Sequence, residues 1–418
     1  MKTVVAAGAF DTKGADYEFL VERLRSCGVN VLTVDFGVLG DPPFVPDVTN
    51  AEVARAGGAE LSALRESKDK TQAMRAMAEG LPRVLSRLRD EGRLDGVCGM
   101  GGSGGTTILA AGVKALPIGV PKLLISTVAA GDVSAYVGSA DVTMMHSVVD
   151  VAGLNRISRQ IYTNAAAAIA GMVQAIRPGS AAERPLVAAS MFGNTTACID
   201  RARGSLDRAG WEVLVFHATG SGGKTMQRLA SEGLLAGLLD LTTTEFADEV
   251  CGGVFSAGPE RVNIGAATPI PVVLAPGCVD MCNFGARASV PSQYGSRLLY
   301  EWNANVTLMR TSVEENRGIG ALIAETANRC AGPVIVLLPL RGVSMLDSPG
   351  GPFWDPDADH ACYDAIRSRL KPGISVMEID ANINDPVFAD RATQVFLELS
   401  GASGVIASLA PGSLGGLV

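Results

Sequence analysis

The sequence predicts an α/β fold built from two Rossmann-like domains, each a mainly parallel sheet with helices on both faces. Short apolar segments alternate with helical patterns along 418 residues, a length sufficient for two such cores. Glycines gather where the apolar segments end, as expected of turns between strands and helices. Segments such as VPKLLIST (120–127) and GPVIVLLPL (332–340) are apolar on both faces, which is typical of buried parallel strands.

The amino-terminal half opens with a βαβ unit. Thr3–Phe10 is the predicted first strand, an amphipathic helix ends at Gly28, and a second strand follows. A later helix is expected over 67–91, where Pro82 would kink it or open a second helix. Further elements expected here are a strand over 95–100, a helix beginning near residue 105, a strand over 120–127 and a helix over 157–176.

The alternation restarts after RPGSAAERP (177–185), the segment expected to link a first domain (1–180) to a second (181–418). Ser312 and Glu315 match a capping box at the start of a helix. The other elements expected here are strands over 185–192, 211–218, 234–243, 271–277 and 332–340, and helices over 197–209, 226–232 and 313–330.

Composition excludes several classes of protein. The net charge is −8 and no run of Lys or Arg exceeds two residues, which argues against binding to nucleic acid or an anionic membrane. No apolar stretch is long enough for a signal peptide or a membrane span, so we expect a cytoplasmic protein. The eight cysteines lack paired spacing and are expected to be buried thiols, with no zinc site.

The glycine-rich segment GMGGSGGTT, between a strand and a helix, is the main candidate site. A helix starting there exposes free N–H groups, and glycines let a phosphate approach the backbone. The alternative is a turn that needs positive φ at one or two positions. It is not a dinucleotide fingerprint, because no acidic residue follows at the expected spacing. The candidate ligands of an anion are Gly101, Gly102, Ser103, Gly104, Gly105, Thr106 and Thr107.

FDTKG, at the end of the first predicted strand, adds a second group of candidates. Lys13 could neutralise a phosphate, with Thr12 beside it, and Asp11 could hold Mg²⁺, which prefers few carboxylates plus ligand oxygens. The alternative is a turn or helix cap with a solvated lysine. Ser126 and Thr127, which end another predicted strand, are expected near the same phosphates.

HATGSGGKT (217–225) contains a second glycine-rich segment. Its end matches a P-loop, but Ala218 stands where that motif needs glycine, so a generic anion-binding loop is the stronger interpretation. His217 precedes it at a strand end, either as a hydrogen-bonded structural residue or as a general acid or base. Glu245 and Asp280 also follow predicted strands and are candidates for acid–base work, unless they are solvated loop residues.

Ten segments resemble, in order, the ATP-binding domain family typified by the tomato mosaic virus resistance protein. The resemblance implies two α/β domains, ATP on the amino-terminal one, and homodimers or higher oligomers. It does not imply a known reaction. The matching segments are FDTKGADYEFL, GMGGSGGTT, STVAAGDVSAYVGSAD, SVVDVAGLN, MFGNTT, FHATGSGGKTM, DLTTTEFADEVCGG, LMRTSVEE, PLRGVSMLD and INDPVFA.

We therefore expect an ATP-binding protein, an enzyme that uses ATP and Mg²⁺ on a small metabolite in a cleft between two domains. ATP phosphates would lie on residues 101–107, and the second ligand would face His217, Glu245 and Asp280. Two alternatives stay open. One is a nucleotide-sensing module without turnover, and the other is a lyase or hydrolase of a phosphorylated or carboxylated metabolite.

Overall fold

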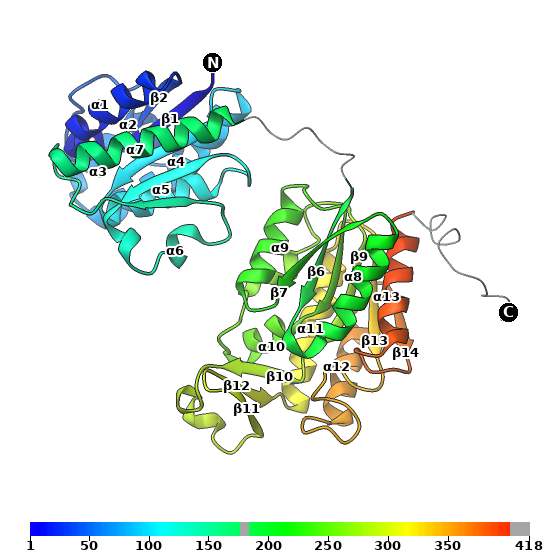
Figure 1. The fold of residues 1–418 in the computed structure, drawn as a ribbon. Coiled ribbons are helices and arrows are strands. Elements are labelled where there is room, and N and C mark those ends of the chain that lie inside the picture. The colour runs from blue at the N-terminus through cyan, green and yellow to red at the C-terminus, as the bar shows by residue number, and fades with distance from the viewer. Residues whose placement is uncertain (176–183, 402–418) are drawn as a thin grey trace. The chain divides into compact units, whose positions relative to one another are not determined.

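The computed structural model describes residues 1–175 and 184–401. The chain divides into two compact units, Met1–Gly179 and Ser180–Val418 (Figure 1). The segment expected to link two domains, 177–185, lies outside the described residues up to position 183. Each unit has its own sheet and core, and each is described by itself.

Unit 1 is a five-stranded parallel sheet in the order β2-β1-β3-β4-β5. The strands are β1 (Thr3–Gly8), β2 (Asn30–Asp35), β3 (Gly96–Gly101), β4 (Lys122–Ser126) and β5 (Thr143–His146). The α-helices are α1 (Phe10–Ser26), α2 (Asn50–Ala56), α3 (Leu61–Ser67), α4 (Lys70–Asp90), α5 (Ser103–Lys114), α6 (Ser134–Val137) and α7 (Arg156–Gln174).

Alternate residues of the buried strands supply two separate cores in unit 1. Val5 and Val97 pack on one face with the apolar sides of α4 and α5. Their neighbours Val4 and Cys98 pack on the other face with α1 and α7. This alternation follows from the two-residue period of a strand, and it explains why these strands are apolar throughout.

Unit 2 contains a six-stranded parallel sheet in the order β14-β13-β9-β8-β6-β7 and a small antiparallel sheet, β10-β12-β11. The strands are β6 (Leu186–Met191), β7 (Glu212–His217), β8 (Gly237–Thr242), β9 (Val272–Gly277), β10 (Met281–Phe284), β11 (Leu299–Asn303), β12 (Val306–Arg310), β13 (Val334–Pro339) and β14 (Ser375–Ile379). The α-helices are α8 (Thr196–Arg208), α9 (Ser221–Ser231), α10 (Thr244–Cys251), α11 (Val313–Arg329), α12 (Pro356–Arg369) and α13 (Pro386–Leu399).

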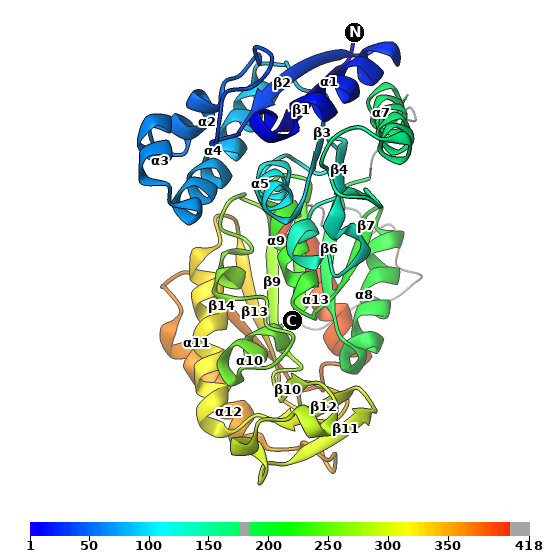
Figure 2. The same cartoon turned by 90° about the vertical axis from the view of Figure 1, so that its left-hand side faces the viewer.

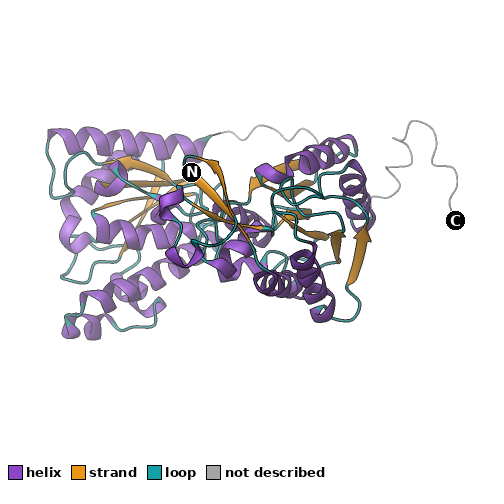
Figure 3. Ribbon diagram, turned by 90° about the horizontal axis from the view of Figure 1, so that it is seen from below, coloured by secondary structure: helices purple, strands orange, loops and turns teal. Residues whose placement is uncertain are grey.

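Helices cover both faces of the large sheet of unit 2. Helices α8 and α13 share one core with the strands, and α9, α10, α11 and α12 share the other. Figure 2 shows α11 and α8 on opposite sides of this sheet, and Figure 3 shows strands between layers of helices. The predicted fold class, two α/β domains with mainly parallel sheets, is confirmed.

Several elements differ from the sequence-based expectation. Helix α4 continues through Pro82 as a single helix, held by an apolar face that includes Met77 and Leu81. Helix α9 begins at Ser221, so the segment expected as a loop forms its first turns. Glycine is required there, because a Cβ at Gly222 would lie 1.8 Å from the carbonyl oxygen of His217. The capping box of Ser312 and Glu315 is confirmed.

Among the helices of residues 1–175 and 184–401, none combines the length and the apolar composition needed to cross a bilayer.

Candidate functional site

In unit 1 the chain passes from β1 to β2 at one edge of the sheet and from β3 to β4 toward the other edge. The neighbouring strands β1 and β3 therefore form a topological switch point. In open α/β sheets, ligands bind beyond the carboxyl ends of the strands at such a point. A cavity of about 810 Å³ lies there. It is lined by Asp11 and Thr12, which follow β1, and by Gly104 and Gly105 in the first turn of α5. The structure therefore brings together the two segments predicted to hold a nucleotide.

The start of α5 has no side-chain cap. Its N-cap residue is Gly102, in extended conformation, and no side-chain hydrogen bond caps this described helix end. A methyl group added at Gly104 would lie 3.6 Å from Cε of Met74, which is ordinary van der Waals contact. Packing therefore does not require glycine at position 104. What its missing side chain does provide is access from the cavity to amides that favour an anion.

Three cations, in α3, at its C-cap and at the start of α4, line the same cavity, and none of them was predicted from the sequence. They are Arg65, Lys68 and Lys70. Arg65 is anchored, since its guanidinium donates to the carbonyl oxygens of Val38 (3.0 Å) and Gly40 (2.6 Å). The two lysines are exposed. The signal in the sequence was the charge-rich segment RESKDK (65–70), which becomes informative only when the fold places it opposite α5.

Two carboxylates hold the backbone at this cavity: Asp11, which lines it, and Asp35, at the end of β2. Asp11 Oδ2 accepts hydrogen bonds from the amides of Leu39 (2.7 Å) and Gly40 (3.2 Å). Asp35 Oδ1 accepts from Phe10 (3.0 Å) and Gly37 (2.8 Å). Burial, and to a lesser degree the charge of Asp11, raises the pKa of Asp35. The remaining oxygens, Asp11 Oδ1 and Asp35 Oδ2, are buried without a described hydrogen-bond partner.

Other predicted ligands of unit 1 are occupied within the protein. The ammonium of Lys13 donates to the carbonyl oxygen of Val151. The hydroxyls of Thr106 and Ser126 are buried and lie 2.6 Å apart, and that of Thr107 donates to Ser103 O at 2.9 Å. The predicted residues that do not line the cavity are Lys13, Gly101, Gly102, Ser103, Thr106, Thr107, Ser126 and Thr127.

In unit 2, the glycine-rich start of α9 is closed by the protein's own carboxylate. Glu245 Oε1 accepts hydrogen bonds from the amides of Gly220 (2.8 Å) and Gly223 (3.0 Å). Glu245 Oε2 accepts from Nε of Arg261 at 2.8 Å, and Arg261 also donates to Asp240 at 2.7 Å. Glu245 is 1% exposed. This segment was predicted to bind an anion, and the anion it holds in the structure is Glu245.

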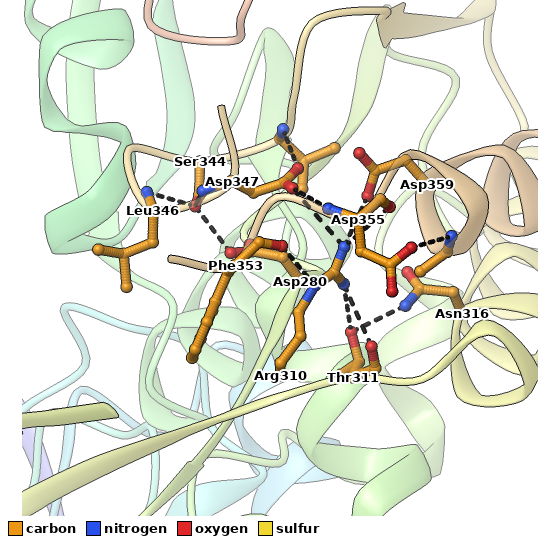
Figure 4. Close-up of polar contacts among 12 residues, drawn as sticks. Asp280, Arg310, Thr311, Asn316, Ser344, Leu346, Asp347, Phe353, Asp355 and Asp359 are labelled. Atoms are coloured by element: carbon orange, nitrogen blue, oxygen red, sulfur yellow. Dashed lines mark hydrogen bonds and ion pairs between the residues drawn. The ribbon is translucent and has the colours of Figure 1, made fainter. Parts of the chain in front are cut away.

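Asp280 belongs to a different buried cluster, shown in Figure 4. Asp280 Oδ2 accepts from the hydroxyl of Ser344 at 2.8 Å. Arg310 lies 3.1 Å from a carboxylate oxygen of Asp359 and 3.6 Å from one of Asp347. Burial and the charge of Asp347 raise the pKa of Asp280 to about 7 and that of Asp359 to about 9. One guanidinium thus contacts the carboxyl groups of Asp347 and Asp359, and the raised pKa of Asp359 favours its neutral form at neutral pH.

His217, the third predicted catalytic residue, is exposed at the end of β7. Its ring lies 6.2 Å from that of Phe192. Among the described residues, no hydrogen bond or ion pair joins His217 to the side chains of Glu245 or Asp280. The three residues therefore lie in three separate environments. The difference arises because the carboxyl ends of six strands spread over a wide edge, so that a shared edge does not ensure contact.

Comparison with known families decides the relationship of this chain. Residues 2–178 match the model of the "Uncharacterised protein family (UPF0261) N-terminal domain", and residues 184–400 match that of the "C-terminal domain" of the same family. The chain belongs to the UPF0261 family. A UPF0261 protein of Clostridium tetani is 42% identical over 93% of this chain and 96% of its own length. UPF0261 protein RA0729 of Rhizobium meliloti is 42% identical over 96% of this chain and all of its own length.

The UPF0261 relatives include a plant protein. The ToMV resistance protein Tm-1(GCR237) of Solanum lycopersicum is 38% identical over 95% of this chain, which spans 56% of the tomato protein. The predicted relationship to that protein is thus confirmed, whereas ATP binding stays a prediction. Among solved structures, MurG of Acinetobacter baumannii covers 98% of this UPF0261 chain and 93% of its own, with 10% identity and a TM-score of 0.21, too low to carry an argument.

Proposed function

We propose that unit 1 is a nucleotide-binding unit that takes ATP with Mg²⁺. One observation carries the proposal: a cavity of about 810 Å³ at the switch point of the sheet combines the uncapped start of α5 with three cations. Its volume lies within the roughly 300–1,000 Å³ of small-molecule sites. The phosphates would lie on the amides of Gly104 and Gly105, and Lys68 and Lys70 would neutralise them.

The contrast between α5 and α9 supports the choice of unit 1. Both helices begin with similar glycine-rich sequences, GGSGGTT and TGSGGKT. At the start of α9, the amides of Gly220 and Gly223 donate to Glu245. The carboxylate leaves no room for a second anion, since a Cβ at Gly223 would lie 2.1 Å from Glu245 Oε2. The start of α5 has no such partner. Of the two helix ends, only that of α5 offers unoccupied donors to a phosphate.

Asp11 is the residue proposed to meet Mg²⁺. Its Oδ1 is a buried oxygen without a described partner, which fits a carboxylate ligand, although it lies against Gly37. The described residues contain no cluster of three or more metal-ligating side chains. This fits Mg²⁺, which is commonly bound through one or two carboxylates and substrate phosphates. Bound there, Mg²⁺ would offset phosphate charge, while Asp11 Oδ2 holds the loop that contains Leu39 and Gly40.

Use of the bound ATP on a small metabolite remains part of the proposal. Phosphoryl transfer needs positioning and charge neutralisation more than a reactive side chain, which Lys68, Lys70 and the α5 amides would supply. Nucleotide sensing without turnover is the second candidate. It is favoured by the burial of Glu245 and Asp280, whose carboxylates already have partners within the protein.

Isothermal titration calorimetry with ATP, ADP, AMP and NAD, each with and without Mg²⁺, tests the proposal. We expect ATP to bind more tightly than AMP, because the distal phosphates supply the contacts with α5. Gly104→Val should abolish ATP binding, because its side chain would cover the amides. The matched control is Lys224→Ala, which removes an exposed cation beside the closed end of α9. Equal affinity for AMP and ATP, or equal losses in both variants, would refute the proposal.

A further inference from the structure

A second cavity, of about 650 Å³, lies in unit 2 at the carboxyl ends of three parallel strands. It is lined by Gly193 and Asn194 after β6, by Ser344 after β13, and by Asn384 after β14. None of the residues predicted as catalytic or nucleotide-binding lines it. Its chemistry therefore has to be derived from the side chains that surround it.

Two amide groups at this cavity carry oxygens without partners. Asn194 is 1% exposed and its Oδ1 has no described hydrogen-bond partner, while its Nδ2 faces the sulfur of Met281 at 3.4 Å. Asn384 donates from Nδ2 to the carbonyl oxygen of Asn194 at 2.9 Å, and its Oδ1 is likewise buried and unpartnered. Buried acceptors without donors are costly, so these two oxygens favour a ligand that donates hydrogen bonds.

The charge of the cavity excludes an anionic ligand. Asp200 and Asp385 supply carboxylates, whereas no Lys, Arg or His is among the residues that line it. Ser344 separates the cavity from the buried carboxylate of Asp280, to which its hydroxyl donates at 2.8 Å. A phosphate would meet repulsion here and find no cation. This cavity thus lacks the cations that line the cavity of unit 1 beside its carboxylates.

An exposed tryptophan stands next to the cavity. A methyl group at Gly193, which lines the cavity, would lie 3.7 Å from Cζ2 of Trp302 on β11. The Trp302 side chain is 41% exposed, and the ring of Tyr300 lies 6.5 Å from it. Large aromatic rings that stay exposed beside polar groups are suited to ligands with one apolar face and polar edges.

We propose that this cavity binds an uncharged, hydroxyl-rich small molecule of the sugar or cyclic polyol type. Its hydroxyl groups would donate to Oδ1 of Asn194, to Oδ1 of Asn384 and to the carboxylate of Asp200. The C–H face of its ring would lie against Trp302. The proposal concerns unit 2 and holds whether or not unit 1 binds ATP.

Saturation-transfer NMR on the full chain tests this proposal. The probes are D-glucose, D-ribose and myo-inositol at about 10 mM. For a probe with a dissociation constant of about 0.1 mM, this is about a hundredfold excess over that constant, so the site would be saturated. Choline and inorganic phosphate serve as a cationic and an anionic comparison. We expect saturable binding of at least one of the three hydroxylated probes and none of choline or phosphate.

Variants then locate the binding site. Trp302→Ala should lower the affinity for the bound probe about tenfold. Asn194→Leu, which has similar volume but no acceptor, should abolish binding. Leu298→Ala is the matched control, since it truncates another exposed apolar side chain of unit 2. Because Trp302 is exposed, its variant decides the test even if Asn194→Leu fails to fold.

Three results would overturn the proposal. The first is that no hydroxylated probe saturates. The second is that choline or phosphate binds at this site instead. The third is that a bound sugar or polyol keeps its affinity in Trp302→Ala.

Discussion

Glu245 Oε1 accepts hydrogen bonds from the backbone amides of both Gly220 and Gly223, at 2.8 and 3.0 Å. A carboxylate from α10 thus occupies the first turn of α9, where a phosphate would otherwise bind. Similar glycine-rich sequences therefore begin two helices with different consequences. One end is satisfied inside the protein, and the other, at Gly104 and Gly105, opens onto a cavity.

Glu245→Gln should destabilise unit 2 without affecting unit 1. The substitution removes one of the two carboxylates that Arg261 contacts, both of them buried, and breaking a buried ion pair costs about 3–5 kcal/mol. Urea unfolding followed by tryptophan fluorescence measures this, because the three tryptophans (Trp211, Trp302 and Trp354) all lie in unit 2.

The control for this variant is Glu325→Gln, which breaks an exposed pair with Arg329. It should cost at most about 1 kcal/mol. Equal losses in the two variants would show that the buried ion pair of Glu245 with Arg261 does not stabilise unit 2.

Removing the cations that line the cavity beside α5 should weaken the binding of ATP more than the binding of AMP. The double variant Lys68→Ala/Lys70→Ala leaves the anchored Arg65 in place, and we expect ATP affinity to fall about tenfold or more. AMP, with fewer phosphate charges, should lose less. Calorimetry at two salt concentrations checks this, because screening should reduce the difference between variant and wild type.

The double variant Arg25→Ala/Arg156→Ala is the matched control for these lysines. It removes two exposed cations, from α1 and α7, which pack on the other face of the sheet. A similar loss of ATP affinity in this variant would mean that net charge, and not the position of Lys68 and Lys70, determines binding.

Asp11→Asn should remove the Mg²⁺-dependent part of ATP affinity. Asparagine can still accept hydrogen bonds from Leu39 and Gly40, so the loop should keep its position. The carboxylate charge at Oδ1 is lost. Titrations of ATP with Mg²⁺ and with excess chelator separate the two contributions, and an unchanged response to Mg²⁺ would contradict the role of Asp11.

The stability of unit 2 should fall as the pH rises from about 4 to about 9. In the folded protein the pKa of Asp280 is raised to about 7 and that of Asp359 to about 9, by burial and by the charge of Asp347. The unfolded chain, with aspartates near pKa 4, holds fewer protons over this range. For each extra proton that the folded state binds, the free energy of unfolding falls by about 1.4 kcal/mol as the pH rises by one unit.

The stability that the protonated forms of Asp280 and Asp359 contribute is fully present below about pH 4, the pKa of aspartate in the unfolded chain. It is lost as the pH rises to the folded pKa of each residue. Urea midpoints by tryptophan fluorescence measure the trend. Asp359→Asn, which stays neutral, should flatten the slope between pH 7 and 9. Stability that is constant or rises over that range would contradict the protonated cluster.

The sequence was sufficient for the fold class and for most of the parallel strands, because buried parallel strands and amphipathic helices have local patterns. It did not predict the small antiparallel sheet of β10, β11 and β12. Asp11 and Gly104 were both recognised, and the strand order places them at one cavity. The partner of a glycine-rich helix start could not be predicted. Glu245 reaches Gly223 through tertiary packing, and no local pattern distinguishes a carboxylate that closes such an end from one that faces solvent.

The positions of three lysines were also not predictable, because they too depend on tertiary packing. Lys68 and Lys70 carry no motif, and only the turn between α3 and α4 places them at the cavity. Lys13 follows a strand end like a phosphate ligand, yet its ammonium bonds to Val151, far away in the sequence.

A crystal structure with a non-hydrolysable ATP analogue and Mg²⁺ tests the central claim most directly. The claim predicts phosphate oxygens within hydrogen-bond distance of the amides of Gly104 and Gly105, with Lys68 or Lys70 beside them. Density for the phosphates in unit 2, or in unit 1 away from the first turn of α5, would contradict it.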